Sequence, residues 1–418
     1  MTDPRWPLLR ASLDRLAPRY QDVLCALVAY PSVVGDERPA QRFLRDVAAD
    51  AGLTAELYEV DPTALASDPR AGLADLGRRP RPNLVAVVPG SGGGRSLALS
   101  GHVDVVPIGE PDAWHHDPFG GRIQDGHLHG RGALDMKGGL VAALHAIAAL
   151  RASGIPLRGD LVFESVIEEE ATGNGALAAR LHGPHVDAAI IPELSGEQML
   201  IATPGVLWAE LTTTGRSGYV GQAGAAVNAI DVMLVVLDGL RSLPDILNAQ
   251  FRHAAYAGSG APLTLNVGTI AGGDWPSSVP LACRAGIRFS FPIGWSVTEA
   301  KRTLNARLAE IARAHPWLRE HPPTVRWHGF QAEGWDIDPG TPVVETLAAA
   351  IRGETKVPAS TAPLFGTADA RFFRDAGIPA VYYGPIGDGQ HGPDESVDLA
   401  SVARVTRVLA RAALAWCS

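Results

Sequence analysis

Apolar and polar residues change their spacing along the chain, and each spacing predicts an element. Short apolar runs, NLVAVV at 83–88, LVFESVI at 161–167 and AAII at 188–191, are typical of buried strands. Residues 136–154 are rich in Ala and Leu and predict a helix that ends at a glycine. Residues 11–29 predict one helix, or two short helices broken at Pro18, because proline disrupts helix interiors.

Strands and helices alternate over the first two hundred residues. This order predicts an α/β fold, with a mostly parallel sheet that helices cover on both faces. Ligand sites in such sheets lie beyond the carboxyl ends of the strands. Polar residues follow three of the predicted strands at these ends: His102 with Asp104, the glutamates 168–170, and Glu193.

From about residue 206 the pattern changes to polar-alternating strands and two amphipathic helices. This order predicts an α+β module, in which two helices pack against an antiparallel sheet. After about residue 328 the chain returns to helix, strand and a last helix. We therefore predict a main domain of residues 1–205 and 328–418, with an inserted lid domain of residues 206–327.

Composition narrows the class of protein. The chain has 418 residues, and its net charge of −9 argues against nucleic acid as a partner, since phosphate binding requires a basic surface. No uninterrupted apolar run reaches the roughly 20 residues of a membrane span, and the first ten residues do not resemble a secretory signal. We expect a cytoplasmic protein without a membrane partner.

The three cysteines, Cys25, Cys283 and Cys417, are far apart and odd in number. This pattern argues against a disulfide framework and against a cysteine zinc site, and it fits a reducing compartment. A metal ion would therefore need histidine and carboxylate ligands.

His102 and Asp104 lie two residues apart at the end of a strand, so their side chains point to the same side. Asp104 could accept the second ring N–H of the histidine and orient it. A hydrogen-bonded loop histidine is the alternative. Asp135 lies between glycines just before a helix, where an N-cap is the simple interpretation. Lys137 is interpreted as a surface cation.

Three consecutive glutamates, 168–170, follow a predicted strand. They could form the first turn of a helix, or one could bind a metal while its neighbour takes a proton from water. Glu193 and His391, each taken alone, would more often be solvated loop residues. Together, two histidines and several carboxylates at strand ends have the composition of a two-metal hydrolytic site.

Five segments resemble, in order and spacing, the motifs of the co-catalytic metallopeptidases, a family that includes acetylornithine deacetylase, succinyl-diaminopimelate desuccinylase, aminoacylase and carboxypeptidase G. These segments are GHVDVVP, GRGALDMKGG, EEEATGNGA, the PE of IIPELS, and QHGPDE. The resemblance covers essentially the whole chain. It implies one or two divalent ions (zinc, manganese or cobalt), a small carboxylate-bearing substrate, and a homodimer formed through lid helices and an edge strand.

The resemblance also implies roles for individual residues. His102 and Glu193 would bind one metal ion, Glu170 and His391 would bind the other, and Asp135 would bridge the two.

Further roles follow from the same resemblance. Asp104 would support the first histidine ligand, and Glu169 would be the general base that deprotonates water. Gly366 and Arg371 match a segment that approaches the substrate carboxylate, and Arg288 would be a second anion contact. Glu168 occupies a position where relatives usually have Asp.

One position departs from the family. Relatives carry a lid histidine in a GxxxHAG-like stretch that stabilises an oxyanion, and here GRSGYVGQAG has Tyr219. Loss of one good oxyanion donor costs about 100- to 1000-fold in rate. Tyr219 could replace the histidine as a donor, or it could be part of the lid packing.

Amide deacylation of an N-acyl amino acid is the first functional hypothesis. The second is an aminohydrolase that releases ammonia from an electron-poor aromatic amine, because that reaction would relax the demand for the lid histidine. A metal-free binding module is a third class, and the filled ligand positions argue against it.

Overall fold

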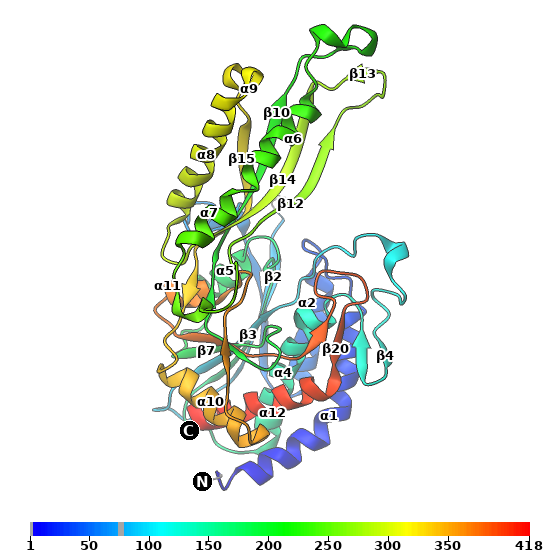
Figure 1. The fold of residues 1–418 in the computed structure, drawn as a ribbon. Coiled ribbons are helices and arrows are strands. Elements are labelled where there is room, and N and C mark those ends of the chain that lie inside the picture. The colour runs from blue at the N-terminus through cyan, green and yellow to red at the C-terminus, as the bar shows by residue number, and fades with distance from the viewer. Residues whose placement is uncertain (1–2, 74–78) are drawn as a thin grey trace.

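A large sheet organises the main domain in the computed structural model, which describes residues 3–73 and 79–418, without the side chains of 222, 223 and 225 (Figure 1). The strand order is β1-β2-β6-β3-β7-β18-β8-β17. The strands are β1 (Thr54–Val60), β2 (Arg81–Val88), β6 (Leu161–Val166), β3 (Leu97–His102), β7 (Ala188–Ile191), β18 (Ala380–Tyr382), β8 (Met199–Leu200) and β17 (Thr361–Ala362).

The centre of this sheet is parallel. Strand β3 pairs in parallel with β6 on one side and β7 on the other, and β18 continues beside β7. Strands β1 and β2 are antiparallel to their neighbours at one edge, and β18 pairs antiparallel with β8 near the other. The predicted α/β class is therefore confirmed, with a sheet that is parallel where the candidate site residues follow β3, β6 and β7.

Helices pack on both faces of the sheet. Leu99 and Phe163 belong to the core shared with α1, α4, α10 and α12, whereas Ala98 and Val162 pack with Phe373 of α11 on the other face. The helices of the main domain are α1 (Trp6–Val28), α2 (Arg38–Asp50), α3 (Pro62–Leu65), α4 (Gly138–Ser153), α5 (Asn174–His182), α10 (Pro342–Thr355), α11 (Ala370–Asp375) and α12 (Leu399–Trp416).

Two helices refine the sequence-based expectations. Helix α1 continues through Pro18 without a break. Pro18 lies on the exposed face of α1, where water can satisfy the carbonyl that lacks an N–H partner. The stretch Ala133–Ser153, which includes α4, contains a segment with the length and apolarity of a membrane span, but that segment is buried inside the protein, as in a core helix.

The inserted module is a four-stranded antiparallel sheet in the order β12-β14-β10-β15. One face packs against the helices, through residues such as Leu207, Ile287 and Phe289. The elements are β10 (Gly205–Thr214), β12 (Leu265–Gly272), β14 (Ala282–Phe291), β15 (Thr324–Ala332), α6 (Ala229–Leu240), α7 (Leu243–Gln250), α8 (Val297–Ala314) and α9 (Pro316–Glu320).

The chain enters this module on β10 and leaves it on β15, and these two strands pair with each other. The predicted limits of the lid, 206 and 327, fall within these two strands. Figure 1 shows the module extending away from the large sheet, with the hairpin region around β13 at its far end.

Three small sheets complete the fold of the described residues. Strands β4 (Arg122–Gln124), β5 (His127–His129), β19 (Gly387–Asp388) and β20 (Ser396–Asp398) form one of them. The turn between β19 and β20 carries residues 389–395 toward the carboxyl ends of the parallel strands. The others are the pairs β9 (Ala202–Thr203) with β16 (Trp335–Asp336), and β11 (Gly218–Tyr219) with β13 (Ser278–Val279).

Candidate active site

The parallel strands bring three of the sequence motifs together. His102 is the last residue of β3, and the glutamates 168–170 and Glu193 follow the neighbouring strands β6 and β7. Asp135 lies just before α4, and the start of α4 packs closely against these residues. At the contact, a Cβ on Gly139 in α4 would overlap the carbonyl oxygen of Pro192. The glycine therefore allows the start of α4 to lie against the segment that carries Glu193.

His102 lies at the centre of one group of acids. Its Nε2 is 3.1 Å from Asp135 Oδ1, 3.3 Å from Glu193 Oε1 and 3.9 Å from Glu169 Oε2. The ligand atoms of His102, Glu169 and Glu193 all lie within 4.8 Å of one another, and those of His102, Asp135 and Glu170 do so too. Burial opposes the charged imidazolium, but Glu193 and Asp135 outweigh it and raise the pKa of His102.

His391 forms a second group on the other side of Asp135. Its Nε2 is 3.2 Å from Asp135 Oδ2 and 3.2 Å from Glu170 Oε2. The two oxygens of the Asp135 carboxylate thus face two different histidines. Gln390, which the sequence analysis did not single out, donates from Nε2 to Asp135 Oδ2 at 2.8 Å.

Asp104 supports this arrangement through the backbone. Its two carboxylate oxygens accept the backbone N–H groups of Glu169 and Glu170, at 3.1 and 3.0 Å. The Nδ1 of His102 is 2.9 Å from the Asp104 carbonyl oxygen and 3.7 Å from the nearer carboxylate oxygen. Asp104 therefore fixes the glutamate segment directly, and the backbone carbonyl is the closer partner of the ring.

Several carboxylate oxygens in this cluster have no hydrogen-bond partner. Glu169 Oε1, Glu170 Oε1 and Glu193 Oε2 are buried and unpartnered among the described residues. Buried charges are costly unless they are paired or bind a metal. Histidine nitrogens and carboxylate oxygens are the ligand set of zinc, manganese and cobalt sites, so the residues present fit divalent ions.

The pKa values of these acids reflect the close packing of carboxylates in the buried cluster. Burial, together with the neighbouring Asp369 and Glu170, raises the pKa of Glu169 well above its ordinary value, although His102 opposes the shift. Burial and Asp135 raise the pKa of Glu170 to about 7. The pKa of Asp135 is held below its ordinary value, because its hydrogen bonds to both histidines outweigh the effect of burial.

Asp369 is a site residue that no sequence pattern had singled out. It is buried just before α11, its Oδ1 has no partner among the described residues, and burial raises its pKa to about 7. Its only sequence signal is an acidic residue inside the GTADARFF segment.

Two further charged groups belong to the support of the site. Glu395 accepts the backbone N–H groups of Leu134 and Asp135 and pairs with Arg131 at 2.6 Å. The interpretation of Lys137 as a surface cation is wrong. Lys137 is fully buried, its Nζ donates to the Tyr30 carbonyl, and burial lowers its pKa to about 7.

Glu168 also has a structural partner. Its carboxylate pairs with Arg81, which contacts Glu37 as well, and accepts a hydrogen bond from the Thr172 hydroxyl. It therefore anchors the segment that carries Glu169, and it does not line the cavity described next.

A cavity of about 540 Å³ opens over the acid cluster, between the main domain and the lid. Asp135, Glu169, Glu170, Glu193 and His391 line it. Arg288 of β14 and Gly366 line the same cavity.

Arg371 does not line this cavity. It is buried, and its guanidinium donates to the carbonyl oxygens of Thr172 and Ala368, both at 2.9 Å. These bonds tie the segment before α11 to the segment after the three glutamates. The geometry therefore favours support of the cavity wall over direct contact with a substrate carboxylate.

Tyr219 lies far from the acid cluster. It is 67% exposed on β11, which pairs with β13 at the far end of the lid in Figure 1, and it does not line the cavity. Within one chain, the structure does not bring Tyr219 to the other candidate residues.

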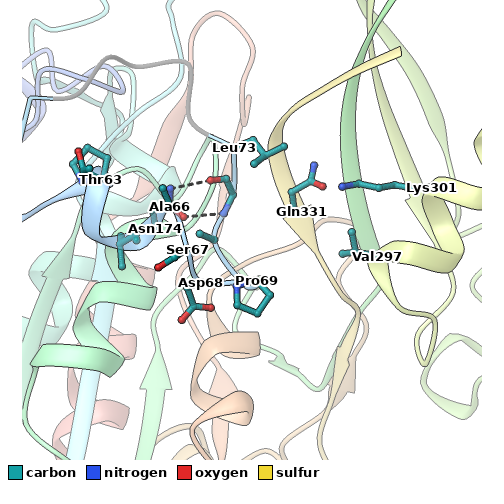
Figure 2. Close-up of a pocket in the computed structure, with 14 residues that line it drawn as sticks. Thr63, Ala66, Ser67, Asp68, Pro69, Leu73, Asn174, Val297, Lys301 and Gln331 are labelled. Atoms are coloured by element: carbon teal, nitrogen blue, oxygen red, sulfur yellow. Dashed lines mark hydrogen bonds between the residues drawn. The ribbon is translucent and has the colours of Figure 1, made fainter. Parts of the chain in front are cut away.

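A second cavity of about 540 Å³ lies between segment 62–73 and the lid (Figure 2). Asn174 closes its floor through two hydrogen bonds with the backbone of Gly72, drawn as dashed lines. Among the described residues that line it, Asp68 is the only acid, and it pairs with Arg70. The described residues of this cavity therefore do not provide the ligands of a metal site.

Comparisons with known proteins agree with this geometry. Residues 98–415 match the model of peptidase family M20/M25/M40. The chain is 29% identical to an N-formyl-4-amino-5-aminomethyl-2-methylpyrimidine deformylase of Halalkalibacterium halodurans, over 98% of this chain and 97% of that protein. It is 32% identical to a succinyl-diaminopimelate desuccinylase of Methylobacterium nodulans, over 92% and 93% of the two chains.

Solved structures share the fold. Human carnosine dipeptidase 1 superposes with a TM-score of 0.77 at 17% identity, covering 99% of both chains. A metallo-carboxypeptidase of Sulfolobus solfataricus gives 0.72 at 17% identity, covering 94% of this chain and 98% of that one. With the family match over three quarters of its length, the chain is a metal-dependent hydrolase of C–N bonds and belongs to peptidase family M20/M25/M40.

Proposed function

We propose that this protein removes the acyl group from a small N-acyl amino acid, with Glu169 as the general base. The observation that supports this proposal is the position of Asp135, whose two carboxylate oxygens lie 3.1 and 3.2 Å from two different histidines. Glu169 stands beside this arrangement, with one oxygen 3.9 Å from His102. A bridging carboxylate with an adjacent, unligated carboxylate suits hydrolysis by activated water.

In this proposal His102 and Glu193 would hold one divalent ion, His391 and Glu170 would hold the other, and Asp135 would contribute to both sites. Zinc, manganese and cobalt all suit these ligands, in one or both positions. When bound, such ions lower the pKa of a coordinated water to about 7 and polarise the amide carbonyl.

Glu169 takes the proton from the attacking water and delivers it to the leaving nitrogen. Its buried position raises its pKa, which makes it a stronger acceptor of the proton from water. Asp104 keeps Glu169 in place through its backbone N–H. We assign Arg288 and Gly366 to the substrate and Arg371 to the support of the cavity wall.

Deacylation ranks above the aminohydrolase alternative. The deformylase and the desuccinylase that this chain resembles both remove acyl groups, judged by their names. The alternative rested on Tyr219, which is remote from the cleft of its own chain. If Tyr219 acts in catalysis, it does so from the lid of a second subunit.

We further propose a cytoplasmic homodimer that pairs through the lid. Val267 and Ile270 of β12 are 39% and 51% exposed, and β12 pairs only with β14 among the described strands. Leu234, on the helix α6 that contacts β12, is 53% exposed. An exposed edge strand with apolar residues favours pairing with another copy. Ile270→Asp should convert a dimer into a monomer in light scattering, whereas the exposed main-domain variant Leu181→Asp should not.

The test of the deacylase proposal is hydrolysis of N-acetyl, N-formyl and N-succinyl amino acids by protein loaded with zinc, manganese or cobalt. Glu169→Gln should lower kcat by at least about 100-fold while metal content stays the same, because the base contributes about 10²–10⁴-fold. Glu345→Gln, an exposed glutamate of α10, is the matched control. Full activity of Glu169→Gln would refute the role of the base.

A further inference from the structure

The lid contributes an aromatic surface to the cavity over the acid cluster. Trp208 of β10 and Phe330 of β15 line the cavity, and their rings pack edge to face with centroids 5.2 Å apart. Phe365, on the main-domain segment before α11, lines the same cavity and is 46% exposed. We call these three residues the aromatic wall.

The position of Trp208 is fixed by the backbone below it. Gly329 has a φ of +58°, and a Cβ at this position would overlap the indole ring of Trp208. The indole therefore lies directly over the β15 backbone. Its Nε1 is buried and has no hydrogen-bond partner among the described residues. The close contact with the Gly329 backbone fixes the orientation of this ring at the cavity wall.

Arg288 is the direct cross-strand neighbour of Trp208. The two residues are partners in the β10–β14 register, on the face of the sheet opposite Ile287 and Phe289, which pack against the lid helices. Directly paired side chains on one face have Cβ atoms about 5 Å apart. A ligand that binds the guanidinium therefore lies beside the indole ring.

The charge of Arg288 has no acidic partner. Its Nη1 donates to the hydroxyls of Ser290 and Thr264, at 2.9 and 3.3 Å, and the structure gives it no ion pair within the described residues. It is the only arginine or lysine among the described residues that line this cavity, whereas four acids lie on the cavity floor. A partly buried cation with neutral partners favours an anionic ligand.

We propose that the cleft selects N-acyl amino acids with an aromatic side chain, the carboxylate binding Arg288 and the ring packing on the aromatic wall. In such substrates the carboxylate is attached to Cα and the ring to the adjacent Cβ. This spacing suits the neighbouring positions of Arg288 and Trp208. The acylated nitrogen then faces the acid cluster. This inference rests on the proposed deacylase function and extends it to the leaving amine.

Three matched substrates separate the two contacts: N-acetyl-L-phenylalanine, N-acetyl-L-alanine, which lacks the ring, and N-acetylphenethylamine, which lacks the carboxylate. With metal-loaded protein, kcat/KM should be at least about tenfold higher for the first than for either of the others. Trp208→Leu should bring the phenylalanine-to-alanine ratio close to one. Arg288→Met should bring the phenylalanine-to-phenethylamine ratio close to one.

Trp327→Leu is the matched control, because Trp327 lies on β15, which pairs with β10, but packs with the helix-covered core of the lid. It should keep both ratios of the parent protein. Calorimetric binding of the products L-phenylalanine and L-alanine gives a readout that is independent of turnover. L-phenylalanine should bind more tightly, and Trp208→Leu should remove the difference.

The outcomes separate this inference from the proposed function. Hydrolysis of the phenylalanine and alanine substrates with equal kcat/KM would overturn the aromatic selection and leave the deacylase function intact. Absence of hydrolysis, with tighter binding of L-phenylalanine that depends on Trp208, would overturn the deacylase function and support the recognition. Equal binding of both products would overturn the recognition in either case.

Discussion

The carboxylate of Asp104 accepts the backbone N–H of Glu169 at 3.1 Å, so a residue after β3 fixes the segment after β6. The second carboxylate oxygen accepts the N–H of Glu170 at 3.0 Å. Asp104 therefore sets the relative position of the proposed base and a proposed ligand without lining the cavity itself.

Asp104→Asn should disturb this segment while keeping the size of the side chain. The amide has only one oxygen, so its NH₂ group would face one of the two backbone donors. We expect kcat/KM to fall by about 10- to 100-fold, which is usual for residues that orient metal ligands. Kinetics and circular dichroism would measure this, with the exposed Asp46→Asn as the control. Parent-like activity of Asp104→Asn would show that the two hydrogen bonds are dispensable.

The contacts of Asp135 predict different metal contents for two variants. His391→Ala removes a side chain that contacts Asp135 and Glu170, so the protein should lose about one ion per chain. Asp135→Ala removes the group shared by both histidines and should lose both ions. Mass spectrometry of the dialysed proteins would measure the stoichiometry.

The exposed His185→Ala is the control for that experiment. It should retain the metal content of the parent protein. If Asp135→Ala and His391→Ala retained the same metal content as His185→Ala, the proposed ligand set would be wrong.

Much of the site follows from local patterns, because polar residues stand directly after apolar strands. His102 and Glu193 are visible in this way, and the α/β class follows from the order of strands and helices. Contacts between segments that lie far apart in the sequence cannot be predicted in this way. Asp369 and Gln390 reach the cluster from segments after the lid, and no spacing near them signals this position.

The solvent exposure of individual side chains is also hard to predict from the sequence. Lys137 has the charge of a surface residue, yet its Nζ reaches the Tyr30 carbonyl inside the protein. A close approach of the backbone explains the glycine at 139, because a Cβ there would overlap the carbonyl oxygen of Pro192. The alternating pattern of β10 predicted a two-sided strand, but the pattern alone could not tell that Trp208 faces the cavity.

The stability of the metal-free protein should fall as pH rises from about 5 to about 8. Burial raises the pKa of Glu170 and of Asp369 to about 7, above the values of the unfolded chain, so the folded state binds more protons until the pH passes about 7. His391 has a pKa raised to about 10 by Asp135 and Glu170, which outweigh burial. Its stabilisation is complete below about 6.5, its unfolded value, and is lost as pH rises toward 10.

Thermal unfolding of metal-free protein at several pH values would test this slope. Glu170→Gln should flatten it, because the glutamine does not titrate. Added zinc or manganese should also flatten it, since a cation neutralises the carboxylates. A metal-free protein that is as stable at pH 8 as at pH 5 would contradict the prediction.

Gly139→Ala tests how closely α4 must approach the segment that carries Glu193. The new Cβ would overlap the carbonyl of Pro192, a backbone atom that cannot rotate away, so we expect a loss of about 1–3 kcal/mol in the free energy of unfolding. Metal affinity should fall as well, because Pro192 precedes Glu193. Gly353→Ala in α10 is the matched control, since its Cβ would meet only ordinary contacts near 3.6 Å from Arg411. There the higher helix propensity of alanine should stabilise by up to about 1 kcal/mol. Equal stability of the two variants in urea unfolding would mean that the helix shifts without cost, and that the glycine is not needed for the site.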